Sequence, residues 1–209
     1  MNLHNLKINF LGDSITEGCC ATDNFGYVDV LARDYGVIAR NYGLGGTRIA
    51  RQRTPSEVPQ YDRDFCGRFR DMEADADMIF VFGGTNDHGH GDAPMGTDAD
   101  RTPDTFLGAL HFLFAGLQAA FPRAKIVVAT PLHRAEEGRA DGVMLIDYVN
   151  QIRIIARHYG LPVLDLYERS CIRADIPEIA ARLTTDGLHP NDAGHAILAE
   201  EIGEFLKTL

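Results

Sequence analysis

The sequence predicts an α/β protein: a three-layer α/β/α fold with a five-stranded parallel sheet, in one domain covering residues 1–209. Short apolar runs alternate with longer stretches of helical periodicity, which is the pattern of β-α-β units with right-handed crossovers. The apolar runs are nearly continuous, as expected for strands that are buried on both faces. No repeat or linker divides the chain, and its length suits a single well-buried core.

We expect five strands, each a short apolar run that is followed by a turn or by polar residues. The second run is the weakest of the five. In open parallel sheets, ligands bind beyond the carboxyl ends of the strands. Residues that directly follow a strand are therefore the first candidates for chemistry. The expected strands are residues 6–11, 37–42, 77–82, 125–129 and 162–166.

Helical periodicity fills the segments between the strands. Thr102, with Pro103 at the first helical position, predicts the start of a helix whose apolar positions continue over residues 106–121. Asp141 is the expected cap of a second helix that runs to about residue 159. Further helices are expected at about residues 191–207 and 27–35, with a shorter one at 65–72.

Composition and charge argue against several classes of function. The chain carries 20 basic and 30 acidic residues, a formal charge of -10 at pH 7, and such a field repels nucleic acids and anionic membranes. No apolar run reaches the roughly 18 residues of a membrane span. We see no signal peptide at the N-terminus and expect a cytoplasmic protein. The four cysteines, two of them adjacent, indicate free thiols rather than a disulfide framework or a zinc site.

Three segments that follow strands contain groups suited to acyl chemistry. Asp13 and Ser14 follow the first strand, where the serine can project its hydroxyl and its own N–H into a crevice. A glycine turn with Gly45 and Gly46 follows the second strand, and a backbone N–H there can donate to an oxyanion. Asn86 follows the third strand and offers an amide NH₂ to the same oxyanion. Taken singly, each is also explained as an ordinary turn or cap residue. The glycine turn is also compatible with a phosphate cradle, although no lysine follows it as in a P-loop.

Before the last expected helix, Asp186 and His189 stand three residues apart. This spacing lets the carboxylate reach Nδ1 of the imidazole while Nε2 faces outward. A serine hydroxyl is a poor nucleophile and needs such a base, held in the right tautomer by a third group. The alternative is a helix-capping aspartate beside an incidental surface histidine.

The type and order of these motifs resemble those of the SGNH (GDSL-type) hydrolase superfamily, over residues 12–189. The resemblance implies a flavodoxin-like fold and an esterase or acylhydrolase activity that requires no cofactor. It implies Ser14 as the nucleophile, His189 as the general base and Asp186 as the residue that orients the base.

The resemblance also implies an oxyanion hole made of the N–H groups of Ser14 and Gly46 and the side-chain amide of Asn86. Gly46 is preferred to Gly45 because the family pattern places its glycine five residues after an asparagine, here Asn41. These donors would hold the negative charge that develops on the carbonyl oxygen during attack.

Possible substrate-binding residues near these motifs are Asp13, Gly45, Asp87, His88 and His133. Asp13 and Asp87 match flanking positions of the family and are expected to brace the loops rather than to react. His88 begins the glycine-rich stretch 88–92, which contains two histidines and an aspartate. No distant third ligand is evident, so we expect no metal there and interpret the stretch as the rim of the cleft. His133 follows the fourth strand and could line the same cleft.

Two further expectations concern polar side chains outside the motifs. His195 falls in the helical pattern of residues 191–207 and is expected on the helix surface. Arg48, Arg51 and Arg53 follow the glycine turn, where they are expected on a solvated face unless they bind an acidic substrate group.

We therefore expect a serine hydrolase that cleaves small-molecule esters of small or medium acyl groups through an acyl-enzyme on Ser14. Carbohydrate O-acetyl esters, lysophospholipids and thioesters are candidate substrates, and acyl transfer to an acceptor other than water would use the same residues. A non-catalytic flavodoxin-like domain that binds a phosphate or nucleotide is the alternative from a different class. On that alternative, Asp186 and His189 would stand together by coincidence. The sequence does not indicate an oligomeric state.

Overall fold

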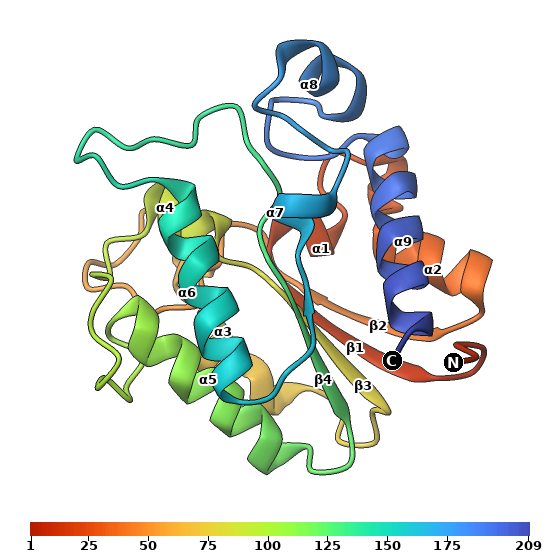
Figure 1. Cartoon of the computed structure of the whole chain (residues 1–209), viewed down its shortest axis with the longest axis horizontal. Coiled ribbons are helices and arrows are strands. Elements are labelled where there is room, and N and C mark those ends of the chain that lie inside the picture. The colour runs from red at the N-terminus through yellow and green to blue at the C-terminus, as the bar shows by residue number, and fades with distance from the viewer.

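The computed structural model describes all 209 residues and contains a parallel five-stranded sheet between two layers of helices (Figure 1). The strand order is β2-β1-β3-β4-β5, and every neighbouring pair is parallel. The predicted fold class is therefore confirmed. The strands are β1 (Lys7–Gly12), β2 (Ile38–Gly43), β3 (Met78–Phe82), β4 (Lys125–Ala129) and β5 (Val163–Leu164).

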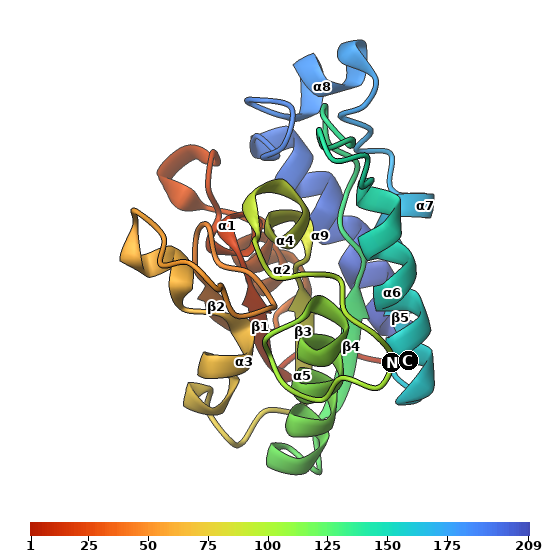
Figure 2. The ribbon, with the colours of Figure 1, turned by 90° about the vertical axis from the view of Figure 1, so that its left-hand side faces the viewer.

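Helices cover both faces of the sheet (Figures 1 and 2). One face carries α2 (Tyr27–Tyr35) and α9 (Asp192–Lys207), and the other carries α3 (Phe65–Arg68), α5 (Phe106–Ala120) and α6 (Leu145–His158). Each face has its own buried apolar core.

The alternation of side chains along β3 explains why its sequence is apolar throughout. Ile79 and Val81 pack in the core under α5 and α6, whereas Phe80 and Phe82 pack in the core under α2 and α9. A strand that faces two cores has no position left for a polar residue.

Several short helices lie in segments for which the sequence predicted only loops. All of them belong to connections rather than to the two main helical layers. Three of them follow β1, β3 and β5 at the carboxyl end of the sheet. The short helices are α1 (Ser14–Glu17), α4 (Thr85–His90), α7 (Leu166–Arg169) and α8 (Pro177–Leu183), together with 3₁₀ turns at Thr22–Asn24 and Pro59–Asp62. A further 3₁₀ turn, Phe69–Asp71, directly follows α3 within the short helix that was expected at residues 65–72.

Two predicted helix starts are wrong by several residues. Helix α5 begins at Phe106 and is capped by Thr105, whose hydroxyl accepts the N–H of Gly108 at 3.1 Å. Thr102 and Pro103 thus lie before the helix. Helix α6 begins at Leu145, and Asp141 instead accepts the N–H of Val143 at 3.2 Å in the preceding turn. In α5 the nearer Thr105 caps the first turn, whereas no N-cap side chain caps α6, where the N–H of Leu145 donates to the carbonyl of Glu137.

The fifth strand is shorter than predicted because Asp165 ends it. Its carboxylate accepts the N–H of Glu168 and caps α7, and it also pairs with the Arg153 guanidinium at 2.8 Å. Leu166, the last residue of the expected strand, is therefore the first residue of a helix.

Two polar side chains that were expected at the surface are buried. His195 is wholly inside, where Nδ1 accepts the N–H of Tyr27 at 3.1 Å and Nε2 lies 3.3 Å from the carbonyl of Cys19. Arg48 is also buried, and its guanidinium contacts Ser56 and His90. Both predictions failed because the partners come from segments distant in the sequence.

None of the helices combines the length and the apolar character that crossing a lipid bilayer requires. The expected cytoplasmic location stays a prediction.

Candidate active site

The order of the strands brings three of the predicted loops to one edge of the sheet. Strand β1 lies between β2 and β3, with Gly12 paired to Gly43 on one side and to Phe82 on the other. The chain leaves all three strands at this edge. Ser14, the glycine turn and Asn86 therefore follow three neighbouring strands directly.

Ser14 is the first residue of α1 and is fixed by its neighbours. Asp13 caps the helix, because its carboxylate accepts the N–H of Ile15 at 3.0 Å. Gly12 packs so closely against Thr16 that a Cβ at this position would lie 1.9 Å from the threonine hydroxyl. The tight strand-to-helix turn thus requires glycine at position 12 and holds the serine at its apex.

Ser14, His189 and Asp186 form a continuous hydrogen-bonded series. The Oγ of Ser14 lies 2.9 Å from Nε2 of His189, and Nδ1 of the same ring lies 2.7 Å from the Asp186 carboxylate. The other carboxylate oxygen accepts the backbone N–H groups of Leu188 and His189. Partial burial pushes the pKa of Asp186 upward, but these hydrogen bonds outweigh it and lower the pKa below its ordinary value.

The ionised Asp186 determines the tautomer of the imidazole. A carboxylate only accepts hydrogen bonds, so Nδ1 of the neutral ring must donate to it. Nε2 is then the ring nitrogen with a free electron pair, and it faces the Ser14 hydroxyl. This is the arrangement in which an imidazole can take a proton from a serine.

In the glycine turn, the two candidate donors differ in availability. The N–H of Gly45 donates to the Glu17 carboxylate at 3.0 Å. The N–H of Gly46 makes no hydrogen bond within the chain. Gly46 has a φ of 74°, and a Cβ there would lie 2.1 Å from the Tyr61 ring. Position 46 therefore requires glycine and presents the free donor.

Asn86 is a buried residue in the first turn of α4. Its Nδ2 donates to the carbonyl of Thr47 at 2.9 Å, which orients the amide and ties it to the glycine turn. An amide nitrogen has two N–H groups, so one remains for a ligand.

Asp13 and Asp87 are both buried, 2% and 4% exposed, and both bond to backbone. The Asp87 carboxylate accepts the N–H groups of Ile49 and Ala50, each at 2.9 Å, and so holds the segment after the glycine turn. Burial raises the pKa of each aspartate to about 6. Both carboxylates therefore stabilise the backbone of the loops.

His88 and His133 lie at the same edge of the sheet, but both rings are buried against protein. His88 packs edge-on against Tyr148, and neither of its ring nitrogens has a hydrogen-bond partner. His133 bonds to Glu137 at 2.6 Å and lies over the Tyr167 ring. A role of either ring in binding substrate stays a prediction.

Arg68 supports this edge of the sheet and was not singled out from the sequence. It is buried, and its guanidinium donates to the carbonyls of Gly12 at 2.6 Å and Tyr42 at 2.5 Å. It also reaches the Thr47 hydroxyl at 3.1 Å. Burial lowers the pKa of Arg68 to about 10, so the side chain is a cation at neutral pH. One side chain thereby joins the ends of β1 and β2 to the glycine turn.

Two cysteines lie next to His189, a proximity that the sequence did not predict. The Sγ atoms of Cys19 and Cys20 are 3.4 Å apart, and together with a ring nitrogen of His189 they fall within 4.8 Å of one another. All four cysteines of the chain are free thiols. Burial, the neighbouring Cys20 and the carboxylates of Asp186 and Glu17 raise the pKa of Cys19 to about 12. This thiol is therefore protonated at neutral pH, and in that form it is a poor nucleophile.

A polar cavity of about 560 Å³ lies beside the Asp186–His189 loop. The cavity and this loop are adjacent because the segment around Ala135, which lines the cavity, contacts the loop: the N–H of Ala135 donates to the carbonyl of Gly187 at 2.8 Å. Arg134 and Arg139 line the cavity, and Ala140 is its only aliphatic residue. The complete lining is residues 88–91, 134, 136 and 138–141.

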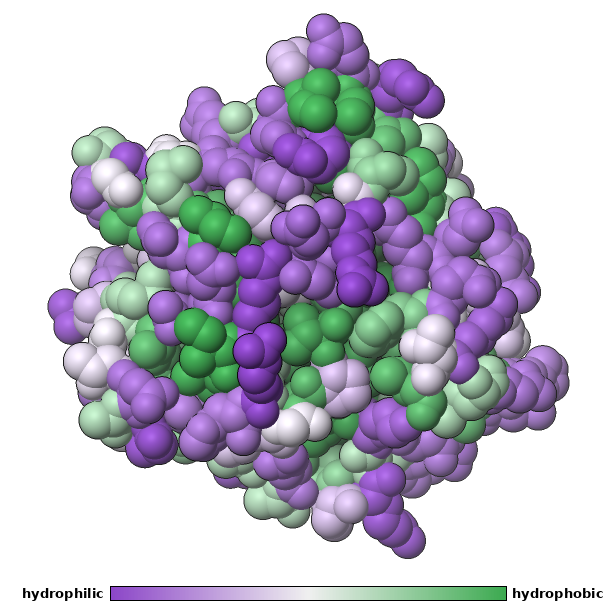
Figure 3. Space-filling view, viewed as in Figure 1, coloured by the Kyte–Doolittle hydropathy of each residue, from purple (hydrophilic) through white to green (hydrophobic).

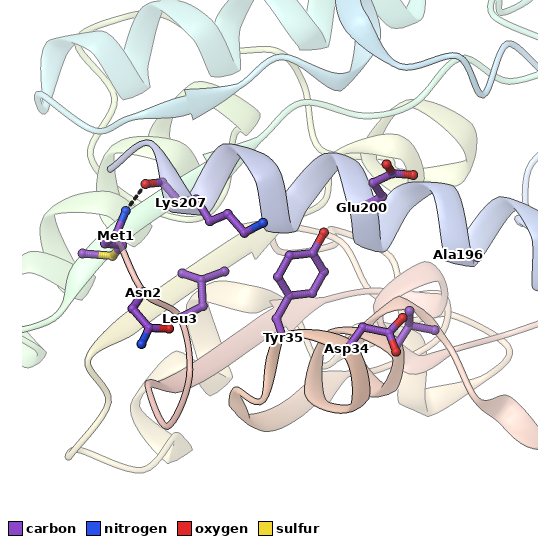
Figure 4. Close-up of a pocket in the computed structure, with 9 residues that line it drawn as sticks. Met1, Asn2, Leu3, Asp34, Tyr35, Ala196, Glu200 and Lys207 are labelled. Carbon is purple, nitrogen blue, oxygen red and sulfur yellow. Dashed lines mark hydrogen bonds between the residues drawn. The ribbon is translucent and has the colours of Figure 1, made fainter.

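A second cavity, of about 660 Å³, lies between α2, α9 and the N-terminal residues and contains none of the predicted site residues (Figure 4). Lys207 extends toward the Tyr35 ring, with Nζ 4.9 Å from the ring centroid, and the Met1 amino group donates to the carbonyl of Lys207 at one end. This hollow belongs to the helical layer rather than to the carboxyl edge of the strands.

Comparisons with known proteins match nearly the whole chain. The model of the GDSL-like lipase/acylhydrolase family covers residues 10–197. A GDSL lipase of Mycobacterium tuberculosis is 27% identical over 205 residues, which are 94% of this chain and 79% of that protein. A solved structure from Lactobacillus plantarum is 33% identical with a TM-score of 0.87, over 98% of each chain. The lipase/acylhydrolase of Enterococcus faecalis, 24% identical, shares the fold with a TM-score of 0.67 over 97% of this chain and 96% of that one.

Proposed function

This chain belongs to the GDSL-like lipase/acylhydrolase family, and we propose on that basis that it hydrolyses carboxylic esters of small or medium acyl groups through an acyl-enzyme on Ser14. The observation that carries the proposal is the hydrogen-bonded series of Ser14, His189 and Asp186, with contacts of 2.9 and 2.7 Å. These distances are within the reach that proton transfer from a nucleophile to its base requires.

In the first half of the reaction, the Ser14 hydroxyl attacks the ester carbonyl while Nε2 of His189 takes its proton. The charged imidazolium is stabilised by Asp186, which stays ionised. Negative charge moves to the carbonyl oxygen, where the N–H groups of Ser14 and Gly46 and the amide of Asn86 hold it. The imidazolium then gives its proton to the departing alcohol, and the acyl group remains on Ser14.

In the second half, water takes the place of the alcohol. His189 removes a proton from the water as it attacks the acyl-enzyme, and the same donors hold the second oxyanion. The proton then returns to the Ser14 oxygen as the carboxylic acid leaves. The steps use only water and the side chains and backbone N–H groups of the chain itself.

The surroundings of the site favour a polar alcohol, such as the sugar of a carbohydrate O-acetyl ester, as the leaving group. The cavity beside the Asp186–His189 loop offers the guanidinium groups of Arg134 and Arg139 together with two carboxylates, and its lining contains a single aliphatic residue. On the face seen in Figure 3, apolar side chains form patches that hydrophilic residues interrupt. Enzymes that dock on lipid surfaces expose broader apolar areas.

A substrate screen tests this proposal. The wild type is assayed on p-nitrophenyl esters of increasing acyl length and on acetylated sugars, beside Ser14→Ala. We expect the highest kcat/KM on acetyl and other short esters, and loss of all turnover in a normally folded Ser14→Ala, verified by circular dichroism. Near-wild-type turnover in Ser14→Ala would refute the nucleophile, and a preference for long acyl chains would refute the substrate class.

A further inference from the structure

The cluster of Cys19, Cys20 and His189 offers two sulfur donors and one imidazole nitrogen in one place. Their potential ligand atoms all lie within 4.8 Å of one another. His189 is also the proposed base, so anything that binds the cluster meets the catalytic machinery. The proposed ester hydrolysis has no use for either thiol.

The turn that carries the two thiols is held from both sides. The N–H of Cys19 donates to the carbonyl of Ser14 at 2.9 Å, and the carbonyl of Cys19 contacts the ring of His195 in α9. Thr22 bonds to Asp192 twice at 2.7 Å just beyond the turn. The thiols are therefore positioned by fixed elements rather than by a free loop.

The backbone at Cys20 adopts an unusual conformation. Its φ is 71°, a left-handed value that residues with a Cβ rarely take and that costs of order 1 kcal/mol. With this backbone, the two Sγ atoms lie side by side at 3.4 Å. Both sulfurs thus lie near the same imidazole, although they belong to consecutive residues.

The donor set suits a thiophilic cation. Zinc binds sulfur at about 2.3 Å and imidazole nitrogen at about 2.0–2.1 Å, so its tetrahedral ligands lie roughly 3.5–3.8 Å apart. The Sγ atoms, at 3.4 Å, are already close to this spacing, and the sulfur–nitrogen separations, which are at most 4.8 Å, need to close by up to about 1.3 Å. The carboxylates of Glu17 and Asp186 lie close to Cys19 and make the surroundings negative.

We propose that Cys19, Cys20 and His189 bind a thiophilic divalent cation, with Zn²⁺ as the model ion, and that the bound ion switches the esterase off. Both thiols release their protons to solvent on binding, and water completes the fourth position. The inhibitory half of this inference rests on the proposed function, whereas the binding half does not.

Inhibition is expected because both ring nitrogens of His189 already make contacts that the proposed reaction needs, and a metal ion would replace one of them. Nε2 contacts the Ser14 hydroxyl and Nδ1 contacts Asp186. A metal on Nε2 occupies the electron pair that accepts the serine proton, and a metal on Nδ1 displaces the carboxylate that sets the tautomer. In either case the general base is lost.

The binding half is tested by titrating the intact protein with Co²⁺ or Cd²⁺ and recording the thiolate-to-metal charge-transfer absorption. We expect one equivalent bound in the wild type and in Ser14→Ala, which keeps all three ligands. The band should vanish in Cys19→Ser/Cys20→Ser and persist in Cys171→Ser, a matched control for an exposed cysteine outside the cluster. Absence of a band in the wild type, or a band of equal strength in the double variant, would overturn the site.

The inhibitory half is tested by ester hydrolysis in the presence of Zn²⁺. Cys19→Ser/Cys20→Ser should keep the basal turnover and require at least roughly 10–100-fold more Zn²⁺ for half inhibition, since even indirect support of a ligand is worth that factor. Chelation with EDTA should restore the wild type. Equal Zn²⁺ sensitivity in the double variant and the wild type would refute the switch. A protein that binds Co²⁺ as expected but hydrolyses no ester would contradict the proposed function and leave the site standing.

Discussion

At the scale of single residues, the proposed oxyanion donors are held by contacts that leave one N–H group free on each. The Asn86 amide is anchored through one hydrogen to the carbonyl of Thr47. The N–H of Gly46 is free, whereas that of its neighbour Gly45 is used by Glu17. A donor that is already oriented costs no reorganisation when charge develops in the transition state. Asn86 is the donor that can be removed without altering backbone.

We predict that Asn86→Ala lowers kcat by roughly 10²–10³, the range for loss of one oxyanion donor. KM should change much less, because the bond strengthens mainly when negative charge develops on the carbonyl oxygen. Steady-state kinetics on a short p-nitrophenyl ester measure both constants. Asn150→Ala, which removes an exposed asparagine amide on α6, is the matched control. An unchanged kcat in Asn86→Ala would remove the residue from the hole.

At the scale of elements, two buried charged side chains hold the loops that carry the site. Arg68 spans from α3 to the carbonyls of Gly12 and Tyr42, at the ends of β1 and β2. Asp87, in α4, accepts two backbone N–H groups from the segment after the glycine turn. Each side chain forms hydrogen bonds with backbone groups that would otherwise be buried without partners. Leaving such groups unsatisfied would lower the free energy of unfolding.

We predict that Arg68→Met lowers the free energy of unfolding by about 2–4 kcal/mol, since carbonyls that accepted from the guanidinium lose a buried donor. Denaturation with urea measures the change. Arg123→Met removes an exposed arginine and should stay within about 0.5 kcal/mol of the wild type. Equal stability of the two variants would show that Arg68 does not support this edge of the sheet.

Asp87 also makes stability depend on pH in a defined direction. Burial raises its pKa from 3.8 to about 6 in the folded state. The folded protein therefore keeps this proton to higher pH than the unfolded chain does. The resulting stabilisation is fully present below about pH 4 and is lost as pH rises to about 6, a loss of at most about 3 kcal/mol.

We predict that Asp87→Asn weakens the fall in the free energy of unfolding between pH 4 and pH 6 by up to about 3 kcal/mol, because the amide does not titrate in this range. Urea denaturation at a series of pH values gives the slope. Asp71→Asn changes an exposed aspartate and should keep the wild-type slope. If the slope in Asp87→Asn also matched the wild type, the raised pKa of Asp87 would be contradicted.

The bounds and burial of an element could be predicted where a local sequence pattern determines them. They could not be predicted where they depend on a partner that is distant in the sequence. Strand β4 and helix α2 have the predicted bounds, since a run buried on both faces and an amphipathic repeat are both visible in the sequence. The start of α5 was wrong because Thr105 rather than Thr102 accepts the first free N–H groups. Burial of His195 depends on Tyr27, 168 positions away, and no local pattern reveals that contact.

At the scale of the whole molecule, the topology brings together loops that are far apart in the chain. Ser14 and His189 are separated by 175 positions, yet Oγ of the serine and Nε2 of the histidine lie 2.9 Å apart. The strand order β2-β1-β3 places the serine loop between the glycine turn and the asparagine loop. The family resemblance, confirmed by the match over residues 10–197, predicted which loops carry the motifs. The adjacent Cys19 and Cys20 were not connected to the site, because their spacing does not resemble that of paired zinc ligands.

The claim that Ser14 is the nucleophile activated by His189 is tested most directly by covalent labelling with a fluorophosphonate, followed by peptide mapping in a mass spectrometer. We predict one adduct on the peptide that contains Ser14, no adduct there in Ser14→Ala, and much slower labelling in His189→Ala. Modification of a different residue in the wild type, or labelling of His189→Ala at the wild-type rate, would contradict the account.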